Sequence, residues 1–569
     1  MPGLNENSQK KFKYAVFIVF FLAFLFNFSF FVGRNSFDFP FWDQWGLVEK
    51  ISQENSISET LLFQHNEHRF GVSLAIMEVL AKLTNWSQLW EIRFISLLII
   101  SSSLIFLFIK RKTSDGISLS DLTIPLLFFN IFQFENIDWG FQIGFVLHLF
   151  YIALWLLAIR IKSDGKRNFL LSVISLLGAY SIFHGLIIAI MTIFFLILDY
   201  FVLNLTKNKK LIITTILVNI LIIASIFINY QKNFQTAPAY AINFQTIKYF
   251  SLAVSNGFLF SQENIFWNSL LALIAISFLF KGFLQVVKKK DISGSLIGLF
   301  LIFYSLIFVS LITFGRSNFG TTQALSSRYV TFTMLIPVGI VFILSDTSKK
   351  ISSVARAVIF FFVLFNSFYF VGPTLQYARG MTDGKENALL CYRSSPPEKY
   401  KDCFNVFALL PEEKYLTPLI PKAIRIKKIQ PIWTNFSSRG TFDLYTEPEG
   451  NAVEVSLQSV TKKYQNLKIE DDFFIPENDD PNFIIEKTEN LKGISWKTEI
   501  KGKTKIYFMP EGEEDYSESN STMIEGLDGY FLINVDNLEE SLGKKIRNLR
   551  IDPTDRVEKF KIENFKIYR

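Results

Sequence analysis

The sequence predicts an α-helical polytopic membrane protein with about eleven transmembrane helices, followed by a mainly β domain. Three observations support this fold class. Hydrophobic residues make up 50% of the 569 positions, 63 residues are Phe, and the mean hydropathy is positive. Long apolar runs broken by short charged patches fill residues 14–371. Residues 372–569, in contrast, have the composition of an ordinary soluble domain. A soluble globular chain does not need so much apolar surface.

The first apolar run predicts a membrane anchor. Lys10, Lys11 and Lys13 precede residues 14–32, which are long enough to cross a bilayer of roughly 30 Å. No cleavage site of small residues follows, so we expect a retained signal anchor. The formal net charge of +7 does not indicate nucleic-acid binding, because much of the positive charge lies in short Lys/Arg clusters between apolar runs.

These basic clusters predict the orientation in the membrane. If the N-terminus is cytoplasmic, every second connection should be cytoplasmic and rich in Lys and Arg. All five such connections are basic, at residues 110–112, 160–167, 207–210, 288–290 and 349–356. The alternation requires a turn at His184 that divides residues 168–203 into two helices. The predicted spans are 14–33, 89–109, 119–134, 141–159, 168–183, 186–203, 211–229, 266–283, 293–313, 330–345 and 354–371.

An odd number of spans places residues 372–569 outside the cytoplasm. Residues 372–425 read as a linker that contains both cysteines, Cys391 and Cys403. In an oxidising compartment these either form a disulfide or remain two unpaired thiols, and the spacing leaves both open. Residues 426–569 contain strand-like alternation, as in 504–509 and 529–535, separated by turn-rich stretches. This pattern predicts an extracytoplasmic antiparallel β-sandwich.

Polar side chains gather in the connections predicted to lie outside, above all in the first outer loop, residues 34–88. An ionisable group at membrane depth costs roughly 3 kcal/mol or more unless it is paired or hydrated, so such groups are functional candidates. Of the four His in the chain, three lie at predicted outer loops and none lies in the tail. The candidates are Asp38, Trp42, Asp43, Trp45, Gln64, His65, Glu67, His68 and Arg69 in the first loop, and Glu135, Asp138, Trp139, Gln142, His184, Arg316, Arg328 and Tyr329 in later ones.

Structural roles are open for several of these candidates. Trp residues such as Trp42 and Trp45 serve as anchors at the membrane interface, and Asp43 could cap a helix. His65 and His68 lie three residues apart, which suits either a metal pair, with Asp43 as a further ligand, or a packed polar contact. Arg316 and Arg328 could pair with acidic loop residues.

The layout of residues 1–370 resembles the GT-C superfamily of membrane glycosyltransferases, which use polyprenyl-phosphate-linked sugars as donors. The common features are an N-terminal span, a large first outer loop with an acidic residue, an amphipathic interfacial stretch at 70–83, a helical core and an extracytoplasmic C-terminal domain. Residues 549–562 also look like the final strands of jelly-roll modules on bacterial envelope glycosyltransferases. The motifs similar to those of bacterial envelope proteins of this type are Trp42-Asp43-Gln44-Trp45, residues 64–69, residues 135–142 and Ser327-Arg328-Tyr329.

The resemblance implies transfer of a sugar, with inversion, from a polyprenyl-phosphate-linked donor to an envelope glycan or lipid acceptor at the outer face of a bacterial inner membrane. Asp43 matches the acidic residue that acts in the family as general base or as a ligand of a divalent metal. A carboxylate within hydrogen-bond reach can take the proton that the acceptor hydroxyl loses. The leaving lipid phosphate needs cationic partners, for which Arg316 and Arg328 are the first candidates and Arg69 the reserve.

His65, Glu67 and His68 would then hold a metal, orient Asp43 or bind sugar hydroxyls. The chain lacks the Asp-x-Asp motif of oligosaccharyltransferases, since Asp38 and Asp43 lie five residues apart. Dependence on a divalent metal is therefore left open, and no other cofactor is expected. The expected partners are the lipid-linked donor, the glycan or lipid acceptor and membrane lipids, with no nucleic acid.

Other functions fit parts of the pattern. An O-antigen ligase or polymerase also works outside on lipid-linked glycans, but those families concentrate key Arg and His residues in large late loops. A lipid-linked glycan transporter or flippase favours ionisable residues near the bilayer midplane and two corresponding halves. The sequence has no internal repeat, and few charges fall within the spans apart from His148. A sugar-binding scaffold would leave the outer loops without a chemical role.

Overall fold

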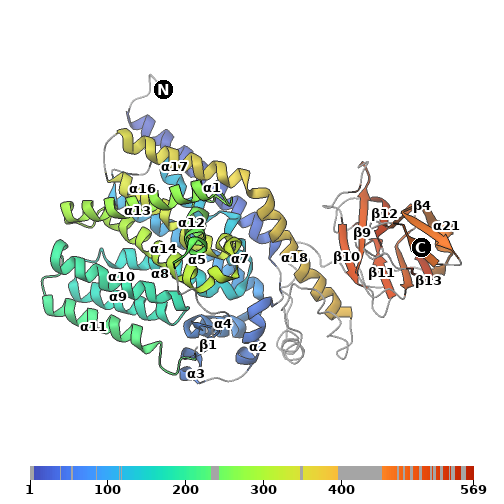
Figure 1. Cartoon of the computed structure of the whole chain (residues 1–569), viewed down its shortest axis with the longest axis horizontal. Helices are drawn as coiled ribbons and strands as arrows, with labels where there is room; N and C mark the ends of the chain where they lie inside the picture. Colours follow the sequence, from blue (N-terminus) through green and yellow to red (C-terminus); the bar gives the residue numbers. More distant parts are fainter. Residues whose placement is uncertain are drawn as a thin grey trace. The chain divides into compact units, whose positions relative to one another are not determined.

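The computed structural model divides into two compact units, one made mainly of residues up to Gly380 and the other containing the C-terminal strands (Figure 1). The structure describes residues 6–36, 38, 40–52, 56–84, 86–114, 116, 118–231, 242–346, 350–394, 451–470, 473–477, 481–486, 491–498, 503–512, 516, 521–525, 530–536, 539, 545–552 and 559–569.

The first unit is helical, as the sequence predicts. Eight helical segments within the described residues are long and apolar enough to cross a membrane. They are Lys10–Asn35, Gln88–Thr113, Gly140–Ala158, Phe183–Leu203, Ile265–Lys289, Gly294–Phe319, Ser327–Ser345 and Lys350–Tyr369. The helices that build the unit are α1 Glu6–Asn35, α5 Gln88–Thr113, α8 Ile143–Ala158, α9 Asp164–Ala179, α10 Leu186–Leu198, α11 Lys209–Ser225, α12 Phe244–Asn256, α13 Ile265–Lys289, α14 Gly294–Arg316, α15 Ser327–Thr333, α16 Leu335–Ser345 and α17 Lys350–Tyr369.

The three remaining predicted spans differ from simple transmembrane helices. Two correspond to α9 and α11, which have 16 and 17 residues. The third, 119–134, is broken into η2 Leu119–Leu122, α6 Thr123–Phe128 and η3 Ile131–Gln133. Asn130 interrupts it, because its side chain accepts a hydrogen bond from Phe132 N and so begins a new turn. The count of eleven spans stays a prediction, whereas the turn that divides α9 from α10 falls at η5 Phe183–Gly185.

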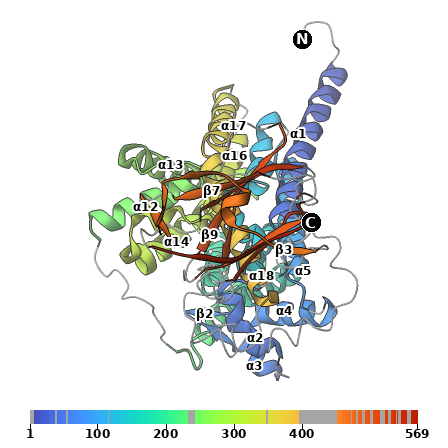
Figure 2. The same ribbon diagram turned by 90° about the vertical axis from the view of Figure 1, so that its right-hand side faces the viewer.

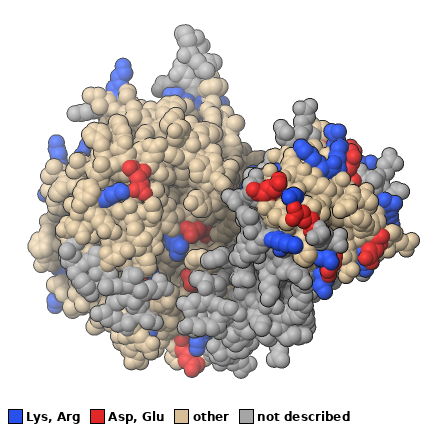
Figure 3. Space-filling model, turned by 45° about the vertical axis from the view of Figure 1, so that its right-hand side comes forward, with Lys and Arg blue, Asp and Glu red and all other residues tan. Residues whose placement is uncertain are grey.

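The helices of this unit pack closely in its interior, and its outer surface is largely apolar. Gly298 of α14 and Gly339 of α16 allow close contact, since a Cβ on Gly298 would lie 2.3 Å from the Gly339 carbonyl oxygen. Large apolar side chains such as Phe26, Leu221 and Phe361 are exposed on the outside. Figure 3 shows broad areas of this unit without charged side chains. Such a surface suits lipid contact.

The segments of the first predicted outer loop lie together at one end of the helical unit (Figures 1 and 2). A hairpin within it pairs His65 with His68, and Asn66 in its turn has a φ of 50°. The segments are η1 Trp42–Gln44, α2 Trp45–Ser52, α3 Ile57–Leu61, β1 Gln64–His65, β2 His68–Arg69 and α4 Gly71–Thr84.

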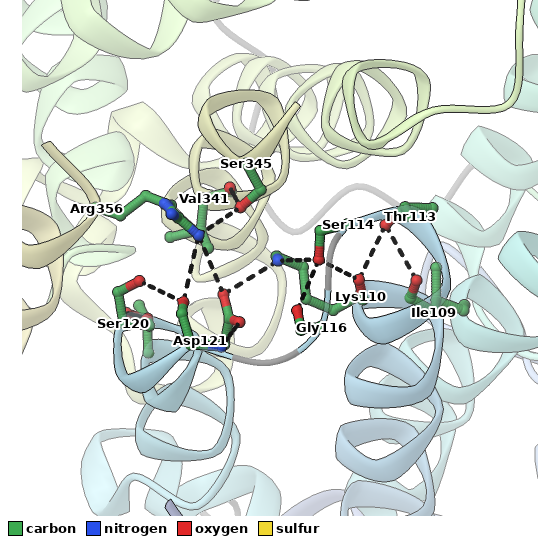
Figure 4. Close-up of polar contacts among 12 residues, drawn as sticks. Ile109, Lys110, Thr113, Ser114, Gly116, Ser120, Asp121, Val341, Ser345 and Arg356 are labelled. Atoms are coloured by element: carbon green, nitrogen blue, oxygen red, sulfur yellow. Dashed lines mark hydrogen bonds and ion pairs between the residues drawn. The ribbon is translucent and has the colours of Figure 1, made fainter. Parts of the chain in front are cut away.

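A buried ion pair fastens the C-terminal end of α5 to η2 (Figure 4). Lys110 Nζ lies 3.2 Å from Asp121 Oδ1, and both side chains are fully buried. Arg356 of α17 adds a second cation, with Nη1 3.9 Å from the same oxygen. Lys110 also donates to Ser114 Oγ at 2.9 Å. Lys110 belongs to the basic cluster at residues 110–112, which is predicted to face the cytoplasm. Its side chain is instead buried in the protein.

The second unit is strand-rich and antiparallel. Its strands form a five-stranded sheet ordered β10-β9-β12-β7-β4, a four-stranded sheet ordered β11-β8-β13-β3, and the pair β5-β6. One hydrophobic cluster includes Phe508 and Leu549 from the first sheet and Trp496 and Phe531 from the second. The strands are β3 Ala452–Glu454, β4 Thr461–Gln465, β5 Leu467–Glu470, β6 Phe473–Pro476, β7 Asn482–Glu486, β8 Gly493–Thr498, β9 Lys503–Pro510, β10 Ser521–Glu525, β11 Tyr530–Asn534, β12 Ile546–Asp552 and β13 Ile562–Tyr568.

The prediction of a mainly β tail is thus confirmed, and the sandwich or jelly-roll arrangement stays a prediction. The proposed Cys391–Cys403 disulfide lies outside the part of the chain whose side chains the structure describes.

Candidate functional site

Asp43 lies in a short turn that is held from several directions. Gln44 Oε1 accepts a hydrogen bond from Phe41 N at 3.1 Å, and Gln44 Nε2 donates to Glu91 Oε2 at 2.6 Å. Trp139 Nε1 donates to the Phe41 carbonyl at 2.9 Å. Gln44, Glu91 and Trp139 are buried, whereas the Asp43 side chain is 32% exposed. The backbone is therefore fixed while the carboxylate remains accessible.

Gly140 permits the contact between this turn and α5. A Cβ on Gly140 would lie 1.9 Å from Glu91 Oε2 and 2.6 Å from Gln44 Nε2, distances that no side chain can tolerate. The glycine thus brings the segment after α7 Phe134–Asp138 against the turn that carries Asp43.

The hairpin places a histidine beside Asp43. His65 Nε2 lies 3.5 Å from Asp43 Oδ1, and the His65 ring packs against Phe141 with centroids 5.1 Å apart. Gly46 leaves room for the imidazole, because a Cβ there would lie 3.3 Å from His65 Cε1. Two of the predicted catalytic residues, separated by more than twenty positions, therefore meet.

The surroundings of Asp43 favour its ionised form. Burial raises the pKa of this carboxyl group, but the adjacent His65 imidazole and the charge of Arg328 lower it further, to below the ordinary value. Asp43 is consequently a carboxylate at neutral pH, as a general base must be.

Glu67 pairs with Arg316 at the end of α14. His68 Nε2 lies 3.8 Å from the same Glu67 oxygen, Oε1. Burial lowers the pKa of His68 to about 4, although the charge of Glu67 acts in the opposite direction. His68 is therefore neutral at pH 7, and the interaction of Glu67 with Arg316 is the ionic one.

Glu135 forms the second Glu–Arg pair, at the beginning of α15. Its Oε1 lies 3.2 Å from Arg328 Nη2, and its Oε2 accepts from Ser326 Oγ, Ser327 Oγ and Arg328 N at 3.1, 2.5 and 3.1 Å. Burial raises the pKa of Glu135, but Arg328, Ser327 and Ser326 lower it further than burial raises it. The Arg328 guanidinium also lies over the Trp139 ring, 5.9 Å from its centroid.

Two candidates from the first loop, Arg69 and Gln64, make structural contacts to main-chain carbonyl groups. Arg69 is buried and donates from Nε to the Ile226 carbonyl at 2.9 Å, and also to the carbonyls of Leu62 and Ile228. Gln64 Nε2 donates to the Gln231 carbonyl at 2.6 Å. The hairpin is thereby bound to the segment after α11.

Asp38 also has a structural contact, because its Oδ1 accepts a hydrogen bond from the main chain of Gln88 at 2.7 Å. Asp38 thus satisfies a donor at the N-terminus of α5.

His184 lies in an aromatic environment. Its ring is 5.2 Å from Phe145, 5.2 Å from Phe308 and 4.6 Å from Phe332, measured between centroids. The ring of His148 lies 4.9 Å away. Both imidazoles are buried within the helical unit.

Of the remaining candidates, one is half-buried and four are buried. Trp42 is half-buried, with its ring centroid 6.4 Å from that of Trp139. The buried candidates are Trp45, Asp138, Gln142 and Tyr329.

Three residues that shape the site, Glu91, Gln44 and Gly140, are not among the candidates that the sequence predicts. Glu91 was detectable as a carboxylate in the first turn of an apolar span, a costly position that calls for a partner. Neither Gln44 as that partner nor the close approach at Gly140 could be inferred, because each depends on segments distant in sequence.

The donor set does not fit a resident metal ion. Within the described part of the chain, no group of three or more His, Cys, Asp or Glu side chains is arranged to hold a metal. Asp43 and His65 approach each other, but Glu67 and His68 are directed to the pair with Arg316.

No protein-family model matches this chain, and no curated protein matches it significantly.

Proposed function

We propose that this protein is an inverting membrane glycosyltransferase that moves a sugar from a polyprenyl-phosphate-linked donor to an envelope glycan or lipid acceptor. The observation that supports it best is the accessible carboxylate of Asp43, with His65 Nε2 3.5 Å away. Arg328 is close enough to lower the pKa of Asp43. A base beside cationic side chains is what a displacement at a sugar phosphate requires.

In the proposed reaction, Asp43 accepts the proton of the acceptor hydroxyl as its oxygen attacks the anomeric carbon. The bond between that carbon and the lipid phosphate oxygen breaks, and the phosphate leaves with the bonding electrons. A single displacement inverts the configuration at the sugar. The proton remains on Asp43, where His65 stays within hydrogen-bond reach, and Arg316 or Arg328 stabilises the departing phosphate.

We place this site on the outer face of a bacterial inner membrane, with the N-terminus cytoplasmic and the C-terminal sandwich extracytoplasmic. The basic connections support that orientation. Single cysteines at Ser56 and Lys290, in a chain whose Cys391 and Cys403 are replaced by Ser, test it. An impermeant maleimide should label the first position in intact cells and the second only after permeabilisation.

The Asp43→Asn variant tests the reaction. Purified protein in nanodiscs should transfer sugar from a polyprenyl-phosphate donor, and the variant should lose at least about a hundredfold in rate, as expected when a general base is removed. Glu59→Gln is the matched control, because Glu59 is an exposed carboxylate in the same loop that only caps α3. Full activity of Asp43→Asn would remove Asp43 from the mechanism.

The alternative is a transporter or flippase for lipid-linked glycans. His148 favours it, because this imidazole lies midway along the Gly140–Ala158 segment beside His184. Movement of a fluorescent polyprenyl-linked sugar across proteoliposomes, lost in His148→Phe and retained in Asp43→Asn, would support transport. A ligase or polymerase would instead require a diphosphate-linked oligosaccharide as donor.

A further inference from the structure

The two Glu–Arg pairs at the candidate site are held in different ways. We propose that Arg316 forms an exchangeable anion subsite, in which Glu67 occupies the place that a ligand phosphate group takes when it binds. The Arg328–Glu135 pair, in contrast, remains intact. The proposal rests on the proposed function for the source of the phosphate, and it extends that function by assigning different roles to the two arginines.

Glu135 is built into the fold. Its carboxylate accepts hydrogen bonds from two hydroxyl groups and one main-chain N–H at the first residues of α15, in addition to the guanidinium of Arg328. Displacement of this carboxylate by a ligand would leave these donors without their acceptor and would expose the N-terminus of the helix. Replacement of the Glu135 carboxylate by an incoming phosphate would therefore cost the free energy of these hydrogen bonds.

Glu67 is held by fewer contacts. In the described part of the chain, Arg316 and His68 are the side chains whose nitrogens lie within 4 Å of its carboxylate. His68 is neutral, so Arg316 provides the ionic interaction. The Glu67 and Arg316 side chains are 17% and 25% exposed, close to the 19% and 30% of Glu135 and Arg328, so the two pairs differ in the hydrogen bonds that hold each carboxylate and not in exposure. A phosphate group can compete with this carboxylate for the guanidinium.

The hairpin does not depend on the Glu67 carboxylate for its position. Tyr230 donates from its hydroxyl to the Glu67 main-chain carbonyl at 2.9 Å. Arg69 and Gln64 bind the strands of the hairpin to residues 226–231. The carboxylate can therefore leave Arg316 while His65 stays beside Asp43. Exchange of one anion for another at Arg316 is compatible with an intact candidate site.

The test measures binding, without sugar transfer. Full-length protein in nanodiscs is titrated with farnesyl phosphate, with inorganic phosphate and with uncharged farnesol by calorimetry. Glu67→Gln removes the competing charge and should bind farnesyl phosphate about tenfold more tightly than the wild type, which corresponds to about 1.4 kcal/mol. Glu135→Gln is the matched control and should show no gain. Glu67→Gln combined with Arg316→Met should lose the gain.

Each outcome decides the proposal. Unchanged or weaker binding by Glu67→Gln, an equal gain in Glu135→Gln, a gain that survives Arg316→Met, or an equal gain for farnesol would each overturn it. The same gain for inorganic phosphate supports a subsite that recognises the phosphate group alone. Glu67→Asp, with a shorter side chain, should show a smaller gain and serves if Glu67→Gln does not fold. A wild type that transfers no sugar while Glu67→Gln binds more tightly would refute the proposed function alone.

Discussion

His65 Nε2 lies 3.5 Å from Asp43 Oδ1, although the two residues belong to different elements of the first loop. Asp43 lies in a turn fixed by Gln44, and His65 lies on a hairpin bound to the segment after α11. Two independent sets of contacts therefore determine one short distance.

His65→Gln should move the acidic limb of the pH–activity profile to higher pH. In the wild type, burial raises the pKa of Asp43, and the interactions with His65, whose Nε2 lies 3.5 Å from the carboxylate, are the largest of the effects that lower it. Without them the pKa rises, so Asp43 is protonated and inactive as a base at a higher pH than before. The profile of the transfer rate against pH checks this, and an unmoved acidic limb would show that Asp43 is not the titrating base.

Glu135→Gln should destabilise the protein at neutral pH by about 1–3 kcal/mol, because several hydrogen bonds to a partly buried charged group are lost. Since the folded pKa of Glu135 is below its ordinary value of 4.5, its contribution is present above about pH 4.5 and is lost as the pH falls through the folded pKa. The difference in unfolding temperature between wild type and variant should therefore shrink on acidification.

Glu263→Gln provides the control for Glu135→Gln. Glu263 pairs with Lys248 at 2.6 Å, but the two side chains are 35% and 28% exposed. Loss of such a surface pair should cost less than about 1 kcal/mol. Equal costs for the two variants would show that the hydrogen bonds to Ser326, Ser327 and the α15 main chain add nothing.

The sequence predicts that the first unit is helical and the second mainly β. It does so because hydropathy and the alternation of apolar and polar residues depend only on neighbouring positions. It also predicts that Asp43, His65 and Glu67 lie in one loop, but not which of them meet. Arg69 illustrates the limit: an Arg near a proposed phosphate site looks like a ligand, yet its guanidinium is bound to main-chain carbonyls. Likewise, Lys110 was used to predict orientation, and it is a buried partner of Asp121. Charge alone does not distinguish an exposed cation from a paired one.

Gly140→Ala should destabilise the protein and impair the candidate site together. The new methyl group would collide with Glu91 Oε2, so either Glu91 or the turn before α8 must move and the Gln44 contact is disturbed. We expect a loss of roughly 1–3 kcal/mol, typical of overpacking. Gly165→Ala is the control, because a Cβ there meets nothing within 4 Å and Ala favours the helix α9. Similar unfolding temperatures for the two variants would contradict the close contact.

Lys110→Met and Asp121→Asn should each destabilise the protein by about 3–5 kcal/mol, because each removes one partner of a fully buried ion pair. Arg356, with Nη1 3.9 Å from Asp121, should make Lys110→Met the milder change, since the carboxylate keeps one cation. The double variant should cost less than the two single changes added together, because no buried charge of the pair then remains uncompensated. Thermal unfolding of the wild type, the two single variants and the double variant in one detergent measures the coupling energy between Lys110 and Asp121. Additive effects would mean that Lys110 and Asp121 do not stabilise each other, and that their burial at the end of α5 has another cause.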